Sequence, residues 1–302
     1  MSFSNRREYL FIYSVKDANP NGDPLNANHP RFDDDSGQVL VSDVRIKRTV
    51  RDQWINKGLD VFVDGETKTL NQRVEELKQK FNVTTGRDAL SLCIDTRLFG
   101  VTFALGNESF SWTGPLQFKW GRSMHMADVM TVQGTAAFAT KEESGQRSFR
   151  NEYIVPFVMI ADYGIANQFT AKTTGASDED LNILFDALWD GTANLITRSK
   201  VGHTPRLLME ITYVDGYCGI IGAIDEKVSL RDTAGDELGP DKQRAIRSCN
   251  DISLNIEPLC EAIQRHLSNI KTVKIIKDSE LKINGFGRIY ELLKDKLNIE
   301  ER

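Results

Sequence analysis

Three cations on one predicted helix, residues 44–57, are best suited by type and spacing to bind an anion: Lys47, Arg48 and Arg51. At 100° per residue they fall within an arc of roughly 100°. Lys47 and Arg51 stand four residues apart with no glutamate near them on that face, so their charges repel unless an anion lies there. Two interpretations stay open, a phosphate-binding surface and an ordinary solvated helix face.

A long polar loop, residues 18–40, precedes this helix and begins with the stretch Asn19-Pro20-Asn21-Gly22-Asp23-Pro24. Its prolines fix φ, and the Asn-Gly pair suits a tight turn. Loops longer than about 12–15 residues are usually functional or disordered. The stretch is therefore either a surface turn or a segment that holds its backbone close to a ligand.

Acidic residues in the same loop raise the question of a metal. His29 lies near Asp23 and near Asp33, Asp34 and Asp35, which permits a hard-cation site or a turn-forming acidic loop. The sequence contains no Gly-rich phosphate loop, no Gly-x-Ser-x-Gly elbow and no His-Glu-x-x-His helix. We predict no catalytic residue, no metal and no cofactor.

A second candidate surface lies in residues 114–123, where Leu116, Phe118 and Trp120 alternate with polar or small residues. An extended segment of this kind packs one face and presents the other, here carrying Gln117 and Lys119. Methionines follow directly at 124 and 126. They are either core filler or soft wedges between stacked bases.

The net charge of −5 argues against a generic nucleic-acid binder unless the positive charge gathers on one face. Basic residues do concentrate in three places, residues 45–51, 119–122 and 198–206. A cationic track beside a long polar loop and a hairpin is typical of proteins that bind single-stranded RNA.

The length of 302 residues with 40% hydrophobic content permits one large core or two small ones. No apolar run of 18 residues exists and the N-terminus is polar, which predicts an unexported, cytoplasmic protein with no membrane association. The four cysteines are far apart, without a Cys-x-x-Cys pair, so we expect reduced thiols.

These residues must be positioned by an α+β fold. A buried strand is expected at residues 8–16 and a mostly helical insertion at 58–106. The element order resembles a ferredoxin-like βαββαβ core within one elaborated domain, residues 1–302. The remaining expectations are helices at 67–81, 88–99, 175–199 (with Leu195 and Ile196 inward), 258–267 and 286–297, and strands at 129–140, 150–161, 207–214, 217–224 and 272–277.

Three motifs together resemble the Cas-seven family, the backbone subunits of type I CRISPR Cascade complexes, in particular the Csh/Csd branch of types I-B and I-C. They are Val15-Lys16-Asp17-Ala18-Asn19-Pro20-Asn21-Gly22-Asp23-Pro24, Val41-Ser42-Asp43-Val44-Arg45-Ile46-Lys47-Arg48, and Gly114-Pro115-Leu116-Gln117-Phe118 with Arg122-Ser123. The resemblance spans most of residues 8–214. It implies an RRM-like palm, helical fingers at about 58–106 and a thumb-like β-hairpin at about 119–155.

The resemblance also implies a function: several copies stack along the crRNA and leave its bases free to pair with target DNA. Further implied partners are the Cas-five type, large Cas-eight type, small and Cas-six type endonuclease subunits. The residues implied to contact RNA are Asn19, Asn21, Lys47, Arg48, Arg51, Gln117, Lys119, Arg122, Met124 (a wedge), Met126 (a wedge), Arg198, Lys200 and His203.

Two rival functions stay open. Related type III backbone subunits cut target RNA with a divalent metal held by an Asp in the loop after the first strand, and this chain has four Asp residues in the comparable loop. A stand-alone RNA-binding module is the other rival, although free binders rely on broad positive potential. The Asn-Pro-Asn-Gly-Asp-Pro pattern belongs to the non-cleaving type I side, and we predict a protein that is not an enzyme.

Overall fold

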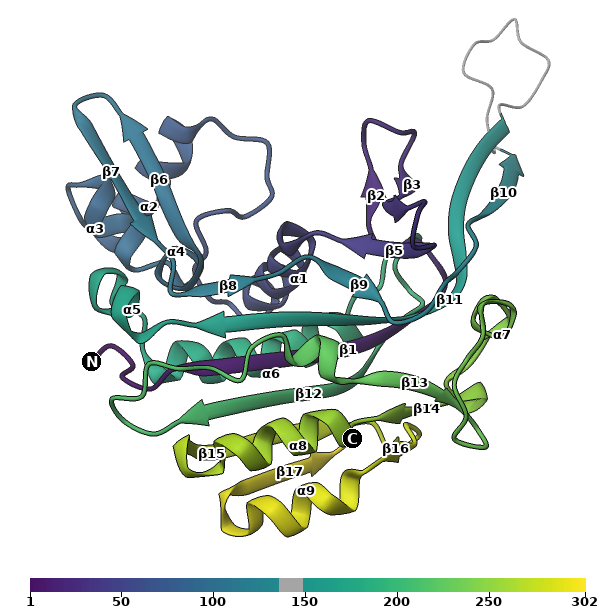
Figure 1. Ribbon diagram of the computed structural model, residues 1–302. Helices are drawn as coiled ribbons and strands as arrows, with labels where there is room; N and C mark the ends of the chain where they lie inside the picture. The colour runs from purple at the N-terminus through teal and green to yellow at the C-terminus, as the bar shows by residue number, and fades with distance from the viewer. Residues whose placement is uncertain (136–148) are drawn as a thin grey trace, which may run out of the picture.

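A large β-sheet organises the molecule. The computed structural model describes residues 1–135 and 149–302, and within them ten strands form one sheet in the order β17-β15-β12-β1-β11-β9-β5-β4, with β8 and β10 also paired to β11 (Figure 1). Only the β15–β17 pair is parallel among these. The strands are β1 (Arg7–Ala18), β4 (Phe32–Asp33), β5 (Gln38–Val41), β8 (Leu116–Phe118), β9 (Gly121–Ser123), β10 (Met130–Thr135), β11 (Phe149–Ala166), β12 (His203–Tyr213), β15 (Ile270–Lys277) and β17 (Leu297–Glu301).

Strand β1 occupies the centre because both of its faces are apolar. Tyr9, Phe11 and Tyr13 enter one core, and Leu10 and Ile12 enter the other. A strand buried on both faces reads as a continuous apolar run, and the prediction of a buried first strand is confirmed.

Helices α1 (Asp43–Asn56) and α6 (Asp178–Ala193) pack on one face of the sheet. Ile46, Val50 and Trp54 of α1 are buried, as the 3.6-residue period predicts. Helix α6 starts with a Ser177 capping box and ends at Ala193, so the predicted extent to residue 199 is wrong. Leu195 and Ile196 do not enter the core, and Ile196 is 76% exposed.

The opposite face carries helices α8 (Glu257–His266) and α9 (Phe286–Leu293) with a small sheet. The predicted helix at 286–297 ends early because residues 297–301 pair with β15. The strand predicted at 217–224 is absent from the described chain. This glycine-containing segment instead turns so that the backbone N–H groups of Ile221 and Gly222 donate to the Glu8 carboxylate. The other elements here are β13 (Ser229–Asp232), α7 (Pro240–Ala245), β14 (Ile252–Asn255) and β16 (Ile283–Asn284).

The insertion after α1 has its own small core. It contains α2 (Leu70–Phe81), α3 (Gly86–Ser91), α4 (Ile94–Phe99), β6 (Gly100–Leu105) and β7 (Glu108–Thr113). The single helix predicted at 88–99 is two helices, because the backbone is extended at Cys93. A mostly helical insertion is therefore only partly right, since a β-hairpin completes it.

Three projections rise from one side of the sheet: the insertion, the hairpin β2 (Gly22–Asp23) with β3 (His29–Pro30), and the hairpin β10–β11 (Figure 1). The β10–β11 pairing confirms the predicted hairpin up to Thr135 and from Phe149, and the predicted strand residues 136–140 lie outside the described residues. A short helix α5 (Gln168–Thr174) links β11 to α6. None of the described helices is long and apolar enough to cross a membrane.

Candidate nucleic-acid interface

The Asn19–Pro24 stretch is tied into the fold by its own side chains. The Asn21 carboxamide oxygen accepts from the Ser42 backbone N–H at 2.8 Å and from its hydroxyl at 2.9 Å, which fixes the chain at the start of α1. Asn19 donates from Nδ2 to the Asn28 carbonyl at 2.8 Å. Both asparagines are buried, so they shape the backbone beside α1.

The cations of α1 that the helical arc singled out each have an acidic partner. Lys47 pairs with Asp43 at 2.9 Å, and the Arg48 Nε donates to Asp52 at 2.9 Å. Arg51 pairs at 2.7 Å with Asp95. The expectation that these charges repel unless an anion intervenes is wrong, because aspartates supplied by the same helix and by the insertion neutralise them.

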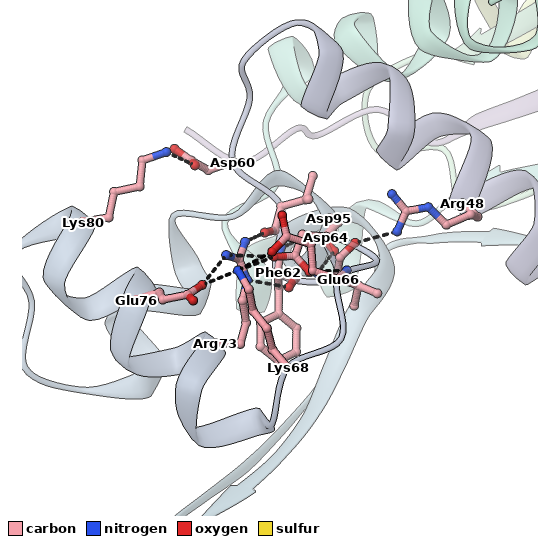
Figure 2. Close-up of polar contacts among 12 residues, drawn as sticks. Arg48, Asp60, Phe62, Asp64, Glu66, Lys68, Arg73, Glu76, Lys80 and Asp95 are labelled. Atoms are coloured by element: carbon pink, nitrogen blue, oxygen red, sulfur yellow. Dashed lines mark hydrogen bonds and ion pairs between the residues drawn. The ribbon is translucent and has the colours of Figure 1, made fainter. Parts of the chain in front are cut away.

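Asp95 is the point at which the insertion joins α1. It is fully buried and accepts three bonds, from Arg51 and from the backbone N–H groups of Phe62 and Val63. Figure 2 shows the surrounding network, in which Arg48 donates to the Val63 carbonyl. Its other labelled members are Asp60, Asp64, Glu66, Lys68, Arg73, Glu76 and Lys80. Arg48 and Arg51 therefore hold the insertion in place, and their role as phosphate ligands stays a prediction.

Two neighbouring hollows meet at the loop of residues 194–200, where they share Thr197 and Ser199. The first, about 430 Å³, lies between Asn19 and Asn28 on one side and the β10–β11 hairpin, with Tyr153, on the other. The second, about 560 Å³, lies between the loop and α1. The two hollows adjoin at this loop, and we refer to them together as the groove.

Arg45 is the α1 cation that lines the groove. Its guanidinium donates to the Thr49 hydroxyl at 2.9 Å, and no carboxylate of the described chain lies within 4.0 Å of it. Burial lowers the pKa of Arg45, yet an arginine stays charged at neutral pH. The sequence prediction did not include Arg45, because it was based on the arc of Lys47, Arg48 and Arg51 on the neighbouring face of the helix. The signal was the polar series Arg45, Thr49, Asp52, Gln53 and Asn56, spaced as one helix face.

The loop after α6 supplies the other groove cations. Lys200 donates from Nζ to the Asn19 carbonyl and, at 3.1 Å, to the Pro20 carbonyl. Arg198 is 67% exposed and pairs with Glu152 on β11 at 2.7 Å. His203 is buried behind Lys200, with Nδ1 2.7 Å from the Lys200 carbonyl, and stacks on Tyr13. Asn19, Arg198 and Lys200 thus line the groove, and His203 supports it.

The predicted residues on β8 and β9 lie away from the groove. Gln117 is exposed and donates to the Gly114 carbonyl. Lys119 pairs with Asp225 and Glu226, and Arg122 pairs with Asp33 at 2.8 Å. Leu116 and Phe118 are buried as expected, but Trp120 is 46% exposed. Trp120 leaves the alternation because β8 ends at Phe118 and β9 begins only at Gly121.

The two methionines lie at the base of the β10–β11 hairpin. Met124 is partly buried against the second core, and the Met126 backbone N–H donates to Gln243. Both side chains are half-buried, and in the described chain they pack against other parts of the protein. Their role as wedges between bases stays a prediction.

The acidic loop does not assemble a metal site among the described residues. Asp23 lies 3.5 Å from Arg31 and Asp33 pairs with Arg122, while Asp34 and Asp35 are exposed. Within residues 1–135 and 149–302, no group of three or more His, Cys, Asp or Glu side chains is arranged to hold a metal ion.

The chain is similar to known proteins over most of its length. A family model described as CRISPR-associated protein Cas7 matches residues 5–257. The chain belongs to the Cas7 family. A Cas7 protein of Haloferax volcanii is 27% identical over 315 residues, which cover 94% of this chain and 90% of that protein.

The chain is also similar to chains of solved structures. A chain of a CRISPR RNA-guided surveillance complex, pre-nicking, superposes with a TM-score of 0.57 at 13% identity, covering 98% of this chain and 96% of that chain. A chain of another CRISPR RNA-guided surveillance complex gives a TM-score of 0.47 at 16% identity, covering 89% and 88%. The first of these matches shows that the mixed α+β architecture around one large sheet is a known fold. All residues that line the groove lie within the range matched by the Cas7 family model.

Proposed function

We propose that this protein binds crRNA as a backbone subunit of a type I CRISPR surveillance (Cascade) complex of the I-B/I-C kind. Copies of it polymerise along the guide RNA and present its bases for pairing with target DNA in antiviral defence. The observation that carries the proposal is the groove, in which Arg45 and Lys200 lie without a carboxylate partner in the described chain.

Charge balance supports phosphate as the ligand of this groove. Four acidic residues line it. Asp52, Asp64 and Glu152 each pair with a cation, namely Arg48, Arg73 and Arg198, whereas Asp17 is exposed and has no ion pair in the described chain. Arg45, together with Lys200 when it is protonated, therefore outweighs the single unpaired carboxylate of Asp17, and this local positive charge attracts a polyanion although the net charge of the chain is −5. Asn, Ser and Thr side chains beside them suit the sugar and phosphate oxygens of single-stranded RNA.

The topology supports a hand-like arrangement. The elements β1, α1, β8–β9, β11, α6 and β12 follow the βαββαβ order. The sheet order β12-β1-β11-β9 supports a ferredoxin-like core. In this proposal the core is the palm, the insertion forms the fingers, and the β10–β11 hairpin is the thumb of one elaborated domain spanning residues 1–302.

The proposed partners are crRNA, target DNA, further copies of the chain and the Cas-five, Cas-eight, small and Cas-six type subunits, in the cytoplasm. The relative that shares the fold over nearly its full length is a chain of a CRISPR RNA-guided surveillance complex, and this supports the assignment. We propose no catalytic step for this subunit.

The test is assembly on guide RNA. The chain is co-expressed with its repeat–spacer RNA and partner subunits, and the complex is analysed by size-exclusion chromatography. Wild-type protein should elute with RNA in a large ribonucleoprotein. Arg45→Glu should lose most of the RNA, because it replaces an unpaired groove cation by an anion. Arg265→Glu, the same charge change at an exposed position of α8, should assemble normally.

Two outcomes would contradict the proposal. One is assembly of Arg45→Glu with normal stoichiometry while its circular dichroism and melting match the wild type. The other is wild-type protein that elutes as a monomer without RNA, which would favour a stand-alone module.

A further inference from the structure

Lys200 has an unusual environment for a lysine that lines a groove. Its ammonium group donates to two backbone carbonyls, those of Asn19 and Pro20, and pairs with no carboxylate of the described chain. The carbonyls belong to the segment that leaves β1, so the side chain lies over the end of that strand rather than reaching into solvent. Lys200 is half-buried, and a partly desolvated ammonium without a counter-charge is costly, a cost that the group can lower by losing its proton.

Several elements bring charged groups near Lys200. Arg45 faces it from α1 across the second hollow, and His203 lies behind it at the start of β12. On its own loop Arg198 is paired with Glu152, and Asp52 and Asp64 in the same hollow are paired with Arg48 and Arg73. The other charged groups at the end of β1 are Lys16 and Asp17, both exposed. The surroundings of the ammonium are thus deficient in negative charge.

Protonation follows from these surroundings. Burial first, and then the charge of Arg45, lowers the pKa of Lys200 to about 7. Burial and the charge of Lys200 lower the pKa of His203 to about 3, so His203 is neutral near pH 7. At neutral pH a substantial fraction of Lys200 is therefore uncharged in the free protein.

We propose that binding of RNA in the groove is coupled to uptake of one proton at Lys200, so that the subunit binds RNA more tightly as the pH falls through neutrality. This rests on the proposed function of the groove. A phosphodiester beside Arg45 and Lys200 supplies the missing negative charge, which favours the ammonium form. Solvent supplies the proton, and the pair formed is an ammonium with a phosphate.

The experiment is isothermal titration of the full-length protein with a short, unstructured oligouridylate at pH 7. It is repeated in two buffers of different ionisation enthalpy, because proton uptake makes the observed heat depend on the buffer. We expect uptake of roughly half a proton at pH 7, and a loss of affinity approaching about tenfold per pH unit between pH 7 and pH 9.

Matched variants isolate the site. In Lys200→Arg the guanidinium stays charged over this pH range, so proton uptake should vanish and the affinity should become nearly independent of pH. Lys200→Met should bind weakly without proton uptake at any pH. Lys172→Arg, an exposed lysine of α5 away from the groove, should behave like the wild type.

The outcomes separate the two claims. If the wild type does not bind RNA, the proposed function and the inference fall together. If it binds with equal heats in both buffers, or if Lys200→Arg takes up as many protons as the wild type, only the inference falls. Circular dichroism of each variant shows whether a weak binder is folded, and a misfolded Lys200→Arg leaves Lys200→Met as the deciding variant.

Discussion

Asp162 on β11 is a single buried carboxyl group whose ionisation should make the stability of the protein depend on pH. Its side chain is 1% exposed, and neither oxygen has a hydrogen-bond partner in the described chain. A Cβ atom on Gly121 would come within 2.0 Å of Oδ1, so the carboxyl lies directly over this glycine of β9. Burial, and then the charge of Asp225, raises the pKa of Asp162 well above its usual value.

Because the folded state holds this proton more tightly, stability is highest below the pKa of the unfolded chain and falls as the pH rises towards the pKa of the folded state. Asp162→Asn removes the ionisable group. We expect it to raise the free energy of unfolding by on the order of 1–3 kcal/mol more at pH 8 than at pH 4.

Denaturant unfolding of both proteins at the two pH values measures this difference. Asp241→Asn, at an exposed position of α7, is the control and should show no such dependence. An Asp162→Asn effect that is the same at both pH values would show that Asp162 carries no ionisation cost.

At the scale of elements, one ion pair fixes the insertion on α1. Arg51, 14% exposed, is the sole side-chain donor to the buried Asp95 in the described chain, and its guanidinium also lies 5.0 Å from the centre of the Phe99 ring. Arg51→Ala leaves a buried carboxylate with two backbone N–H groups, and we expect it to cost about 3–5 kcal/mol of unfolding free energy.

The matched control is Lys78→Ala, which removes the half-exposed pair with Glu75 on α2 and should cost less than about 1 kcal/mol. Denaturant unfolding gives both values, and hydrogen exchange of residues 60–76 should rise in Arg51→Ala alone. Unchanged stability together with lost RNA assembly would instead identify Arg51 as a direct RNA ligand.

For the whole molecule, the question is whether an assembled complex cuts RNA. The aspartates at 23 and 33 are held by arginines, and those at 34 and 35 are exposed. We therefore expect the purified complex to leave complementary RNA intact with Mg²⁺ or Mn²⁺. Gel analysis of labelled target RNA measures this. Cleavage that disappears in an Asp→Ala variant of this loop would establish the ribonuclease alternative.

Local patterns predicted the elements whose stability is decided locally. The apolar run of β1, the buried stripe of α1 and the Ser177 cap of α6 are all visible within a few residues of sequence. They were predicted because strand burial, helix periodicity and capping involve near neighbours. The ends of elements were less predictable. Residues 297–301 form a strand because their backbone pairs with β15, a contact that local sequence does not reveal.

The sequence by itself determined the α+β character, the buried first strand, the polar loop and the basic helix that follows it. Only the tertiary structure decided which of the cations have a carboxylate partner in the described chain. Arg51 is neutralised by Asp95, 44 positions away, whereas the carbonyls that hold Lys200 come from 180 and 181 positions away. Charge compensation acts through space and not along the chain, so the helical arc could show neither that its three cations have acidic partners nor that Arg45 lacks one in the described chain.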